Sequence, residues 1–445
     1  MFKKVLIANR GEISLRVNRA CHELGLKTVA VYSTADKDSL HVKFADESVC
    51  IGPPSPKESY LNMQAILAAA EVTGADAVHP GYGFLSENAE FAKICEASNL
   101  TFIGPSYEAI GSMGHKIRAK EKVESAGVPT LTSIKVKGEV TPEIRKQVEK
   151  VGFPILIKAA MGGGGRGMKI VRRIEDLAGQ LDVARSEAKN AFSSDEVYIE
   201  KYLENPKHIE IQVLGDKHGN VIHLGERDCS IQRRHQKLLE EAPSPVLNEE
   251  VRMKMGLVAV AAAKAVGYSS AGTVEFIVDK NLNFYFLEMN TRIQVEHPIT
   301  EMITGVDLVR EQIRSAMGEK LRYQQKDIQF RGHSIECRIT AEDPRTFAPN
   351  PGQIKLFHPP MGFGVRLEST ACSDYFVPPF YDSMIAKLIV HDENRKMAIM
   401  KMHGALKEFV IHGVKTTIPL HIDIMTHPEF LDGRYDTGFL TRWLA

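Results

Sequence analysis

The chain lacks the features that mark secreted, membrane-spanning or nucleic-acid-binding proteins. Its six cysteines are scattered along 445 residues without a C-x-x-C pair, which fits reduced thiols in a cytosol better than a disulfide framework or a zinc site. The apolar stretch at residues 258–266 is far too short to span a membrane, and the opening M-F-K-K-V-L-I-A is too short for a signal peptide. Basic and acidic residues both number 56, so no overall field favours nucleic acid. We therefore expect a cytoplasmic protein that binds neither a membrane nor nucleic acid.

Length and composition indicate a globular protein with more than one domain. A chain of 445 residues exceeds what one compact core accommodates, and 43% hydrophobic with 25% charged residues is typical of globular proteins. Polar, proline-containing sequence around residues 132–149 indicates a linker and the start of a second module. We predict domains at residues 1–113, 132–203 and 204–445.

Strands and helices alternate along the first hundred residues, which predicts a parallel, doubly wound sheet. No G-x-G-x-x-G follows the first strand, so we do not expect a dinucleotide here. The turn H-P-G-Y-G-F-L-S-E-N at residues 79–88 leaves the carboxyl end of a strand, where such sheets bind ligands. A rigid glycine loop around a buried phenylalanine is an equally good interpretation of the turn alone. The expected strands are residues 5–8, 28–32, 76–79 and 100–103, and the expected helices are 13–24, 60–73 and 88–98.

A glycine run follows a strand that ends in a lysine. Residues 152–158 form the predicted strand, and M-G-G-G-G-R-G-M follows at residues 161–168. Glycines let backbone N–H groups approach a phosphate closely, and Lys158 adds a point charge. No G-K-[ST] follows, so the spacing is not that of Walker A. We predict a mobile lid over a nucleotide; the alternative is a flexible hairpin tip with an incidental lysine.

The segment E-R-D-C-S-I-Q-R-R-H-Q-K at residues 226–237 ends in a basic cluster of Arg233, Arg234, His235 and Lys237. A solvated loop that touches nucleic acid is the alternative, but the chain is neutral and the cluster has no interleaved aromatics. A basic loop beside an acidic metal site better fits a polyphosphate with Mg²⁺.

Residues 284–298, F-Y-F-L-E-M-N-T-R-I-Q-V-E-H-P, place polar side chains on every second position from Glu288 to Glu296. Alternate residues of a strand share a face, so one ribbon presents all of them to one cavity. At roughly 3.3 Å per residue a straight ribbon would separate Glu288 and Glu296 by about 26 Å, too far for one small ligand. We therefore expect a bend after Asn290. An amphipathic edge strand with a wet face is the alternative.

The preceding strand, residues 273–278, carries one carboxylate, Glu275. If the hairpin loop is residues 280–283, Glu275 faces Glu288 directly. Two half-buried carboxylates repel, and one is expected to protonate. A hard divalent cation between them removes the conflict, with Asn290 as a third oxygen ligand. This is the predicted metal site.

Met400-Lys401-Met402 looks like the lysine that carries biotin in carrier domains. Carriers place that lysine on a tight hairpin turn, whereas Ala398, Met402 and Phe409 follow helical spacing here. We predict a helix with Lys401 outside. Further strands are expected at residues 332–339 and 380–387, with a proline-rich loop at 343–352.

Several of these stretches resemble known families. F-P-I-L-I-K-A-A-M-G-G-G-G-R-G and F-L-E-M-N-T-R-I resemble the signatures of ATP-grasp ligases that phosphorylate bicarbonate. A-N-R-G-E-I, H-P-G-Y-G-F-L-S-E-N, E-R-D-C-S-I-Q-R-R-H-Q-K and Y-D-S-M resemble the biotin carboxylase family in particular, and the resemblance covers nearly the whole chain. It implies an α/β ATP-grasp fold. Residues 1–113 would form a Rossmann-like parallel sheet, 132–203 the lid domain, and 204–445 an α+β domain for biotin carboxylation.

The resemblance also implies roles for individual residues. On the nucleotide side, Lys116, Lys158, Gly164 and Gly165 would hold the ATP phosphates, Glu200, Lys201 and Leu203 the adenine, His208 and Gln232 the ribose, His235 the γ-phosphate, and Glu275, Glu288 and Asn290 a Mg²⁺ (or Mn²⁺) ion. On the other side, Lys237, Arg292, Gln294 and the backbone of Val295 would cradle bicarbonate, Glu296 would be the general base, Arg338 would stabilise the biotin enolate, and Tyr82 would pack near biotin.

The implied reaction is the carboxylation, through carboxyphosphate, of biotin on a separate biotin carboxyl carrier protein. It would be the first half-reaction of acetyl-CoA carboxylase in fatty acid synthesis, with carboxyltransferase subunits as further partners. The alternative acceptor is that of a pyruvate or other acyl-CoA carboxylase. A homodimer would form through Arg19, Glu23, Phe363 and Arg366. Met161 departs from the family by standing where a glycine is common, which affects lid flexibility but removes no catalytic group.

Two rival functions compete with this interpretation. A carbamoyl-phosphate synthetase module shares the bicarbonate chemistry, but those chains are longer and duplicated, and no internal repeat is found here. A non-catalytic ATP-binding subunit would need no Lys237, Glu296 or Arg338, and unpaired buried charges are strongly destabilising.

Overall fold

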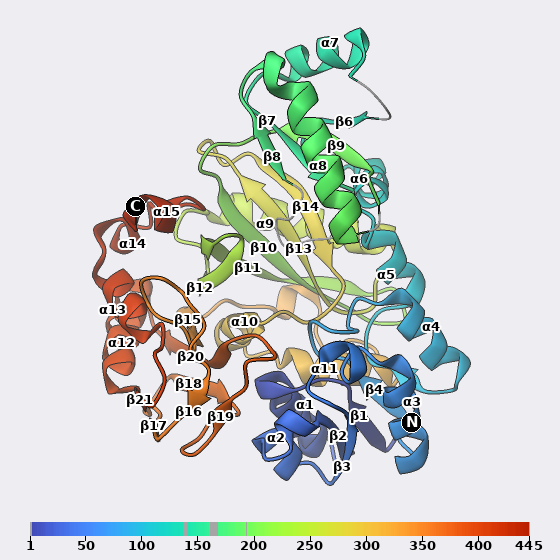
Figure 1. The fold of residues 1–445 in the computed structure, drawn as a ribbon, viewed down its shortest axis with the longest axis vertical. Coiled ribbons are helices and arrows are strands. Elements are labelled where there is room, and N and C mark those ends of the chain that lie inside the picture. Colours follow the sequence, from blue (N-terminus) through green and yellow to red (C-terminus); the bar gives the residue numbers. More distant parts are fainter. Residues whose placement is uncertain (1, 137–139, 161–167, 193, 445) are drawn as a thin grey trace.

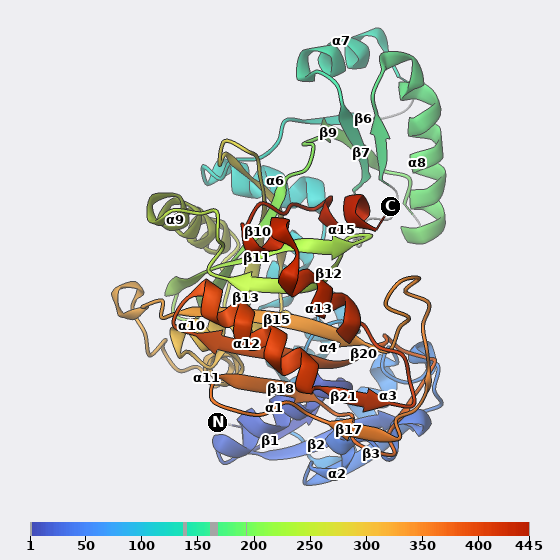
Figure 2. The same ribbon diagram turned by 90° about the vertical axis from the view of Figure 1, so that its left-hand side faces the viewer.

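The computed structural model describes residues 2–136, 140–160, 168–192 and 194–444. Three β-sheets organise these residues: a parallel sheet near the N-terminus, a small sheet that projects at the top of Figure 1, and a large antiparallel sheet between them (Figures 1 and 2). The predicted lid residues Gly164 and Gly165, and Met161, lie outside the described ranges. Among the described helices, none has the length and apolar character that crossing a membrane requires.

The N-terminal sheet has five parallel strands, as predicted. Its central strand is apolar and buried, as a sheet covered by helices on both faces requires. The sequence pattern missed β3, whose residues are largely exposed at the sheet edge. The helix predicted from residue 60 begins at Met63 because Asn62 caps it. In sheet order the strands are β3 (Glu47–Gly52), β2 (Lys27–Ser33), β1 (Lys4–Ile7), β4 (Ala77–His79) and β5 (Thr101–Phe102), and the helices are α1 (Gly11–Glu23), α2 (Leu40–Lys43), α3 (Met63–Thr73), α4 (Ala89–Ala97) and α5 (Tyr107–Met113).

The small sheet at the top of Figure 1 has four strands covered by two helices. The expected linker around residues 132–149 is wrong: the segment is largely strand and helix, with Ile134 and Val136 in the core of this unit. Its polar residues belong to the outer face of a helix that Thr141 caps. The elements are β6 (Ser133–Val136), β9 (Val197–Lys201), β7 (Ile155–Ala159) and β8 (Lys169–Val171), with α7 (Pro142–Val151) and α8 (Leu177–Phe192).

The large sheet has eight antiparallel strands and carries most of the predicted site. The strand predicted at residues 380–387 begins only at Met384. In sheet order the strands are β14 (Phe284–Asn290), β13 (Ser270–Val278), β10 (Lys207–Gly215), β11 (Val221–Arg233), β12 (Gln236–Ala242), β15 (His333–Thr340), β20 (Met384–Asp392) and β18 (Val365–Ser369).

Helices and short strand pairs cover this sheet. The segment around Met400 is helical, as predicted, with Ala398 and Met402 buried and Lys401 paired with Asp392 at 2.9 Å. The remaining elements are α6 (Lys116–Ser125), α9 (Glu249–Ala265), α10 (His297–Thr304), α11 (Leu308–Ala316), α12 (Arg395–Glu408), α13 (Ile418–Thr426), α14 (Pro428–Leu431) and α15 (Phe439–Trp443), the pairs β16 (Gly352–Gln353) with β19 (Phe376–Val377) and β17 (Leu356–His358) with β21 (Val410–His412), and the 3₁₀ turns η1 (Thr34–Asp36), η2 (Pro56–Glu58), η3 (Ile174–Asp176) and η4 (Gln325–Asp327).

Candidate active site

The β13–β14 hairpin pairs Glu275 directly with Glu288, as predicted. The connection is one residue longer than the predicted loop, because Val278 already pairs with Phe284. A bulge between Glu275 and Phe276 restores the pairing. The strand ends at Asn290, where the bend was expected.

Glu275 is an ionised centre of the site, not half of a repelling pair. Its carboxylate lies 3.0 Å from Lys237 and 3.1 Å from His208, and it accepts hydrogen bonds from the amides of Asn290 and Gln294. Burial alone would raise the pKa of Glu275, but Lys237 and His208 outweigh it and hold that pKa well below its usual range. The expectation that one carboxylate protonates is therefore not met at Glu275, because two cationic side chains balance its charge.

Lys237 joins three carboxylates from three different elements. Its Nζ lies 2.5 Å from Glu210, 3.0 Å from Glu275 and 2.6 Å from Glu296. Burial opposes the charge, but these carboxylates raise the pKa of Lys237 well above its ordinary value. Lys237 therefore stays cationic and exchanges partners only with another anion.

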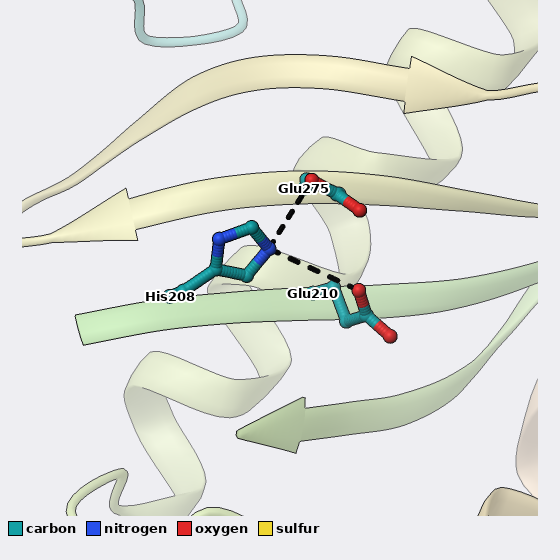
Figure 3. Close-up of side chains that lie close together, drawn as sticks. All are labelled: His208, Glu210 and Glu275. Carbon is teal, nitrogen blue, oxygen red and sulfur yellow. Dashed lines mark ion pairs between the residues drawn. The ribbon is translucent and has the colours of Figure 1, made fainter. Parts of the chain in front are cut away.

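Figure 3 shows the opposite wall of this cluster, where His208 lies close to Glu210 and Glu275. His208 and Glu210 share a face of β10, two residues apart, and Glu210 faces Glu275 across the β10–β13 pair. Burial lowers the pKa of His208, but the two carboxylates give a net rise. The sequence analysis missed Glu210, although the alternation H-I-E-I-Q at residues 208–212 carries its signal.

Glu296 and Arg338 form the second charged pair. Glu296 stands immediately before α10, and its two oxygens contact Lys237 at 2.6 Å and Arg338 at 2.9 Å. Arg338 on β15 also donates from Nε to Glu240 at 2.7 Å. Burial would raise the pKa of Glu296, but Lys237 and Arg338 hold it well below the usual range. In this state Glu296 is a paired carboxylate and a weak base.

The segment after Asn290 turns its polar residues in different directions. Arg292 donates to Glu87 at 2.9 Å and to the side-chain oxygen of Asn290 at 3.0 Å. Glu87 belongs to the turn at residues 79–88, so that turn does contact the site. The carbonyl of Val295 accepts from the buried Lys387 at 2.8 Å. The bend thus brings Gln294 and Glu296 to the Lys237 cluster and leaves Arg292 at its rim.

The lysines predicted to hold phosphates lie on the other side of β14. Lys116, the first residue of α6, lies 3.5 Å from Glu288. Lys158 is buried and lies 2.8 Å from Glu200, which also pairs with Lys120. Burial, together with Lys116 and Lys120, lowers the pKa of Lys158 to about 7.

The remaining predicted nucleotide residues lie around these lysines and β11. Lys201 donates to the carbonyls of Gly152 and Phe153 at 2.9 and 3.0 Å, which leaves its backbone as the part free for a ligand. Leu203 is half-buried just beyond β9. Gln232 is buried and donates to the carbonyl of Cys229.

The basic cluster forms the β11–β12 turn. Arg234 and His235 both have positive φ there, as a tight two-residue hairpin requires. Burial, followed by the charges of Lys158 and His208, lowers the pKa of His235. The turn therefore brings His235 near both the lysine and the histidine of the predicted nucleotide site.

The residue types fit a divalent cation, although the model presents one group other than the predicted one. His208, Glu210 and Glu275 carry ligand atoms within 4.8 Å of one another, but Lys237 already occupies their shared space. Glu288 offers a second carboxylate, on the nucleotide side of Glu275. The Asn290 oxygen accepts from Arg292 and must turn before it can bind a metal.

The predicted biotin and dimer residues lie apart from the Lys237 cluster. The hydroxyl of Tyr82 donates to Glu12; burial and this carboxylate raise the pKa of Tyr82 well above its ordinary value. Phe363 is 97% exposed. Arg19, Glu23 and Arg366 line one surface cavity, and both arginines contact Glu368.

Comparison with known families covers almost the whole chain. Residues 1–110 match the N-terminal domain of biotin carboxylase, residues 115–324 the ATP binding domain of the carbamoyl-phosphate synthase L chain, and residues 336–442 the C-terminal domain of biotin carboxylase. Together with the sheets and the charged site, these matches define the chain as an ATP-grasp enzyme, an ATP-dependent ligase.

Individual relatives narrow this class. The chain is 55% identical to biotin carboxylase 1 of Bacillus subtilis, over 99% of this chain and 98% of that one. A biotin carboxylase–ATP complex from Campylobacter jejuni superposes with a TM-score of 0.96 at 52% identity, covering 99% of each chain. The biotin carboxylase domain dimer of Hydrogenobacter thermophilus 2-oxoglutarate carboxylase, solved with MgADP, ADP and bicarbonate, gives 0.94 at 54% identity, covering 99% of this chain and 98% of that one. The chain belongs to the biotin carboxylase family.

Proposed function

We propose that this protein uses ATP to carboxylate biotin with bicarbonate, the biotin being carried on a separate carrier protein. One observation carries the proposal: Lys237 and Arg338, both cationic, converge on the buried Glu296 while Gln294 enters the same cluster. A small anion fits a site with two cations and an amide donor. The adjacent carboxylate is the group that such an anion needs to lose a proton.

The nucleotide side follows from the lysines around β14. Lys116 and Lys158 bind the ATP phosphates beneath a lid that includes Gly164 and Gly165, and His235 approaches the γ-phosphate. Glu200, Lys201 and Leu203 hold the adenine, the latter two through backbone groups, and His208 and Gln232 lie at the ribose. The lowered pKa of Lys158 supports this role, because a buried lysine among cations gains most from a phosphate partner.

Glu275 and Glu288 are the proposed ligands of a Mg²⁺ or Mn²⁺ ion, with Asn290 beside them. Carboxylate oxygens from paired strands suit a hard cation. When bound, the ion neutralises charge on the ATP phosphates. Glu288 then exchanges its contact with Lys116 for the ion, which releases Lys116 for the phosphate.

Bicarbonate is proposed to bind Lys237, Arg292, Gln294 and the backbone of Val295. Its charge competes with Glu296 for Lys237. Loss of that cationic contact raises the pKa of Glu296 toward values at which it accepts the bicarbonate proton. A base that is weak in the free protein thus becomes stronger when its substrate arrives.

The chemistry proceeds from bicarbonate as a poor electrophile. Deprotonated bicarbonate attacks the γ-phosphorus, which breaks the bond to ADP and forms carboxyphosphate. Carboxyphosphate divides into CO₂ and phosphate, and the phosphate takes the N1′ proton of biotin. The biotin nitrogen then captures CO₂. Arg338 stabilises the negative charge on the ureido oxygen, and Tyr82 packs near the biotin ring.

The partners follow from the reaction. We propose a biotin carboxyl carrier protein, carboxyltransferase subunits, and acetyl-CoA as the final acceptor, which places the protein in fatty acid synthesis in the cytoplasm. Identity does not separate the acceptors, because the B. subtilis relative and the 2-oxoglutarate carboxylase domain are nearly equally similar. The H. thermophilus domain is a dimer, and its likeness supports a homodimer through Arg19, Glu23, Phe363 and Arg366.

We also propose three domains, at residues 1–113, 132–203 and 204–445. Each range contains one of the three sheets, which supports the division.

Phosphate release measured with and without bicarbonate and free biotin tests the function. We expect ATP hydrolysis that depends on bicarbonate, together with carboxybiotin formed from labelled bicarbonate. Hydrolysis that is indifferent to bicarbonate would contradict the proposal.

A further inference from the structure

A fully buried arginine outside the predicted site reaches it through β11. Arg227 faces Glu210 across the β10–β11 pair, and its side chain has no exposed surface. All five N–H donors of a guanidinium are used here. Nε donates to Glu210 at 2.5 Å, Nη1 to Gln212 at 2.7 Å and Thr300 at 3.0 Å, and Nη2 to Gln294 at 2.7 Å and Thr273 at 3.1 Å.

These contacts determine which way the Gln294 amide points. A guanidinium only donates, so the Gln294 atom that lies 2.7 Å from Arg227 must be the amide oxygen. The amide nitrogen then faces the other way, where it donates to Glu275 at 2.8 Å. An anion bound beside Gln294 therefore meets N–H groups. A flipped amide would present an oxygen that repels it.

The position of Arg227 is itself determined by the surrounding elements. Thr273 lies on β13 and Thr300 in α10, the helix that begins just after Glu296. Nη2 is held between Thr273 and Gln294, whereas Nη1 is held between Thr300 and Gln212. The guanidinium plane is thus constrained from both sides of the sheet.

We propose that Arg227 is a positioning residue that orients the Gln294 amide for bicarbonate binding. The inference rests on the proposed function, since Gln294 matters only if an anion binds there. The alternative is a structural role in which Arg227 merely neutralises Glu210.

A double-mutant cycle separates the two roles. Arg227→Lys keeps the charge that Glu210 requires but loses the planar fork. It should raise the KM for bicarbonate about ten- to a hundred-fold, the effect of losing a hydrogen bond to a charged group, while nucleotide affinity is unchanged. In a Gln294→Ala background the same substitution should raise KM far less. Equal factors in the two backgrounds would overturn the proposal.

Two measurements keep the test decisive if Arg227→Lys folds poorly. Thr273→Val removes the acceptor that shares Nη2 with Gln294, and Thr300→Val is its matched control on Nη1. Thr273→Val should raise the KM for bicarbonate more than Thr300→Val does, and the reverse order or equal effects would contradict the proposal.

A readout without catalysis distinguishes this inference from the proposed function. The side-chain amide resonances of Gln294, assigned by their loss in Gln294→Ala, should shift and exchange faster with water in Thr273→Val than in Thr300→Val. Unchanged resonances would overturn the role of Arg227. A wild-type protein without bicarbonate-dependent phosphate release would overturn only the proposed function.

Discussion

Glu275 and Glu288 are direct partners across the β13–β14 hairpin, yet they face different halves of the site. Glu275 contacts Lys237 at 3.0 Å, on the proposed bicarbonate side. Glu288 lies 3.5 Å from Lys116, on the proposed phosphate side. A cation held by both carboxylates would therefore connect the nucleotide to the acceptor of its γ-phosphate.

Glu288→Lys should abolish ATP turnover. A tethered ammonium displaces the metal that the triphosphate needs and repels Lys116, which lies 3.5 Å from Glu288. Phosphate release at saturating Mg²⁺ and ATP measures the loss. Glu250→Lys makes the same charge change at an exposed position of α9 and should leave turnover intact. Normal Mg²⁺-dependent turnover by folded Glu288→Lys would remove the metal assignment.

Glu296→Ala should lose bicarbonate-dependent ATP hydrolysis while still binding ATP. General-base catalysis contributes about 10²–10⁴-fold in rate, and the Glu296 carboxylate contacts only Lys237 and Arg338 among charged groups. Phosphate release and nucleotide affinity are measured on the same preparation. A variant that retains full bicarbonate-dependent hydrolysis would show that another group takes the proton.

Arg338→Gln should separate the two products. Its guanidinium is proposed to act on the biotin enolate, after bicarbonate has been activated, so carboxybiotin formation should fall more than phosphate release. Both products are quantified from one reaction with labelled bicarbonate and free biotin. Arg338 also contacts Glu296 at 2.9 Å, so some loss of hydrolysis is expected. Equal losses of the two activities would contradict the division of roles.

ATP binding near pH 8 should take up protons at Lys158. Burial and neighbouring lysines lower the pKa of Lys158 to about 7, so it is largely neutral at pH 8. A bound phosphate favours the charged form and raises that pKa, so binding draws a proton from the buffer. Calorimetry in buffers of different ionisation enthalpy measures the uptake. Lys158→Arg, which stays protonated, should reduce the uptake, and an unchanged value would assign it to another group.

Phe363→Asp should weaken self-association. Phe363 is 97% exposed in the single chain, and burying a phenylalanine contributes about 1.5–3 kcal/mol, so the dimer constant should rise at least about ten-fold. Sedimentation equilibrium measures it. Phe44→Asp, at a residue that is 57% exposed, is the matched control. Equal association of both variants and wild type would exclude this face.

Local patterns in the sequence predicted much of this architecture correctly. Alternating strands and helices indicated the parallel sheet, and period-two polarity along β14 indicated the site strand, its partner Glu275 and its end at Asn290. These features depend on interactions between neighbours in the chain, so they can be read from the sequence. The exposed edge strand β3 and the strand and helix at residues 133–151 lacked a clear pattern and were missed.

Tertiary structure decided which charges meet. Lys237, Glu210, Glu296 and Arg338 come from four elements, and only the sheet order β13-β10-β11-β12-β15 brings them together. Sequence reasoning expected Glu275 to face an uncompensated carboxylate, whereas Lys237 and His208 neutralise it. It also passed over Arg227, whose role depends on five acceptors from distant segments. The sequence by itself determined which chemical groups are available, through the order of residues along each strand. Their pairing, and with it their protonation, was decided by long-range register, because electrostatic interactions depend on distances that the chain acquires only when folded.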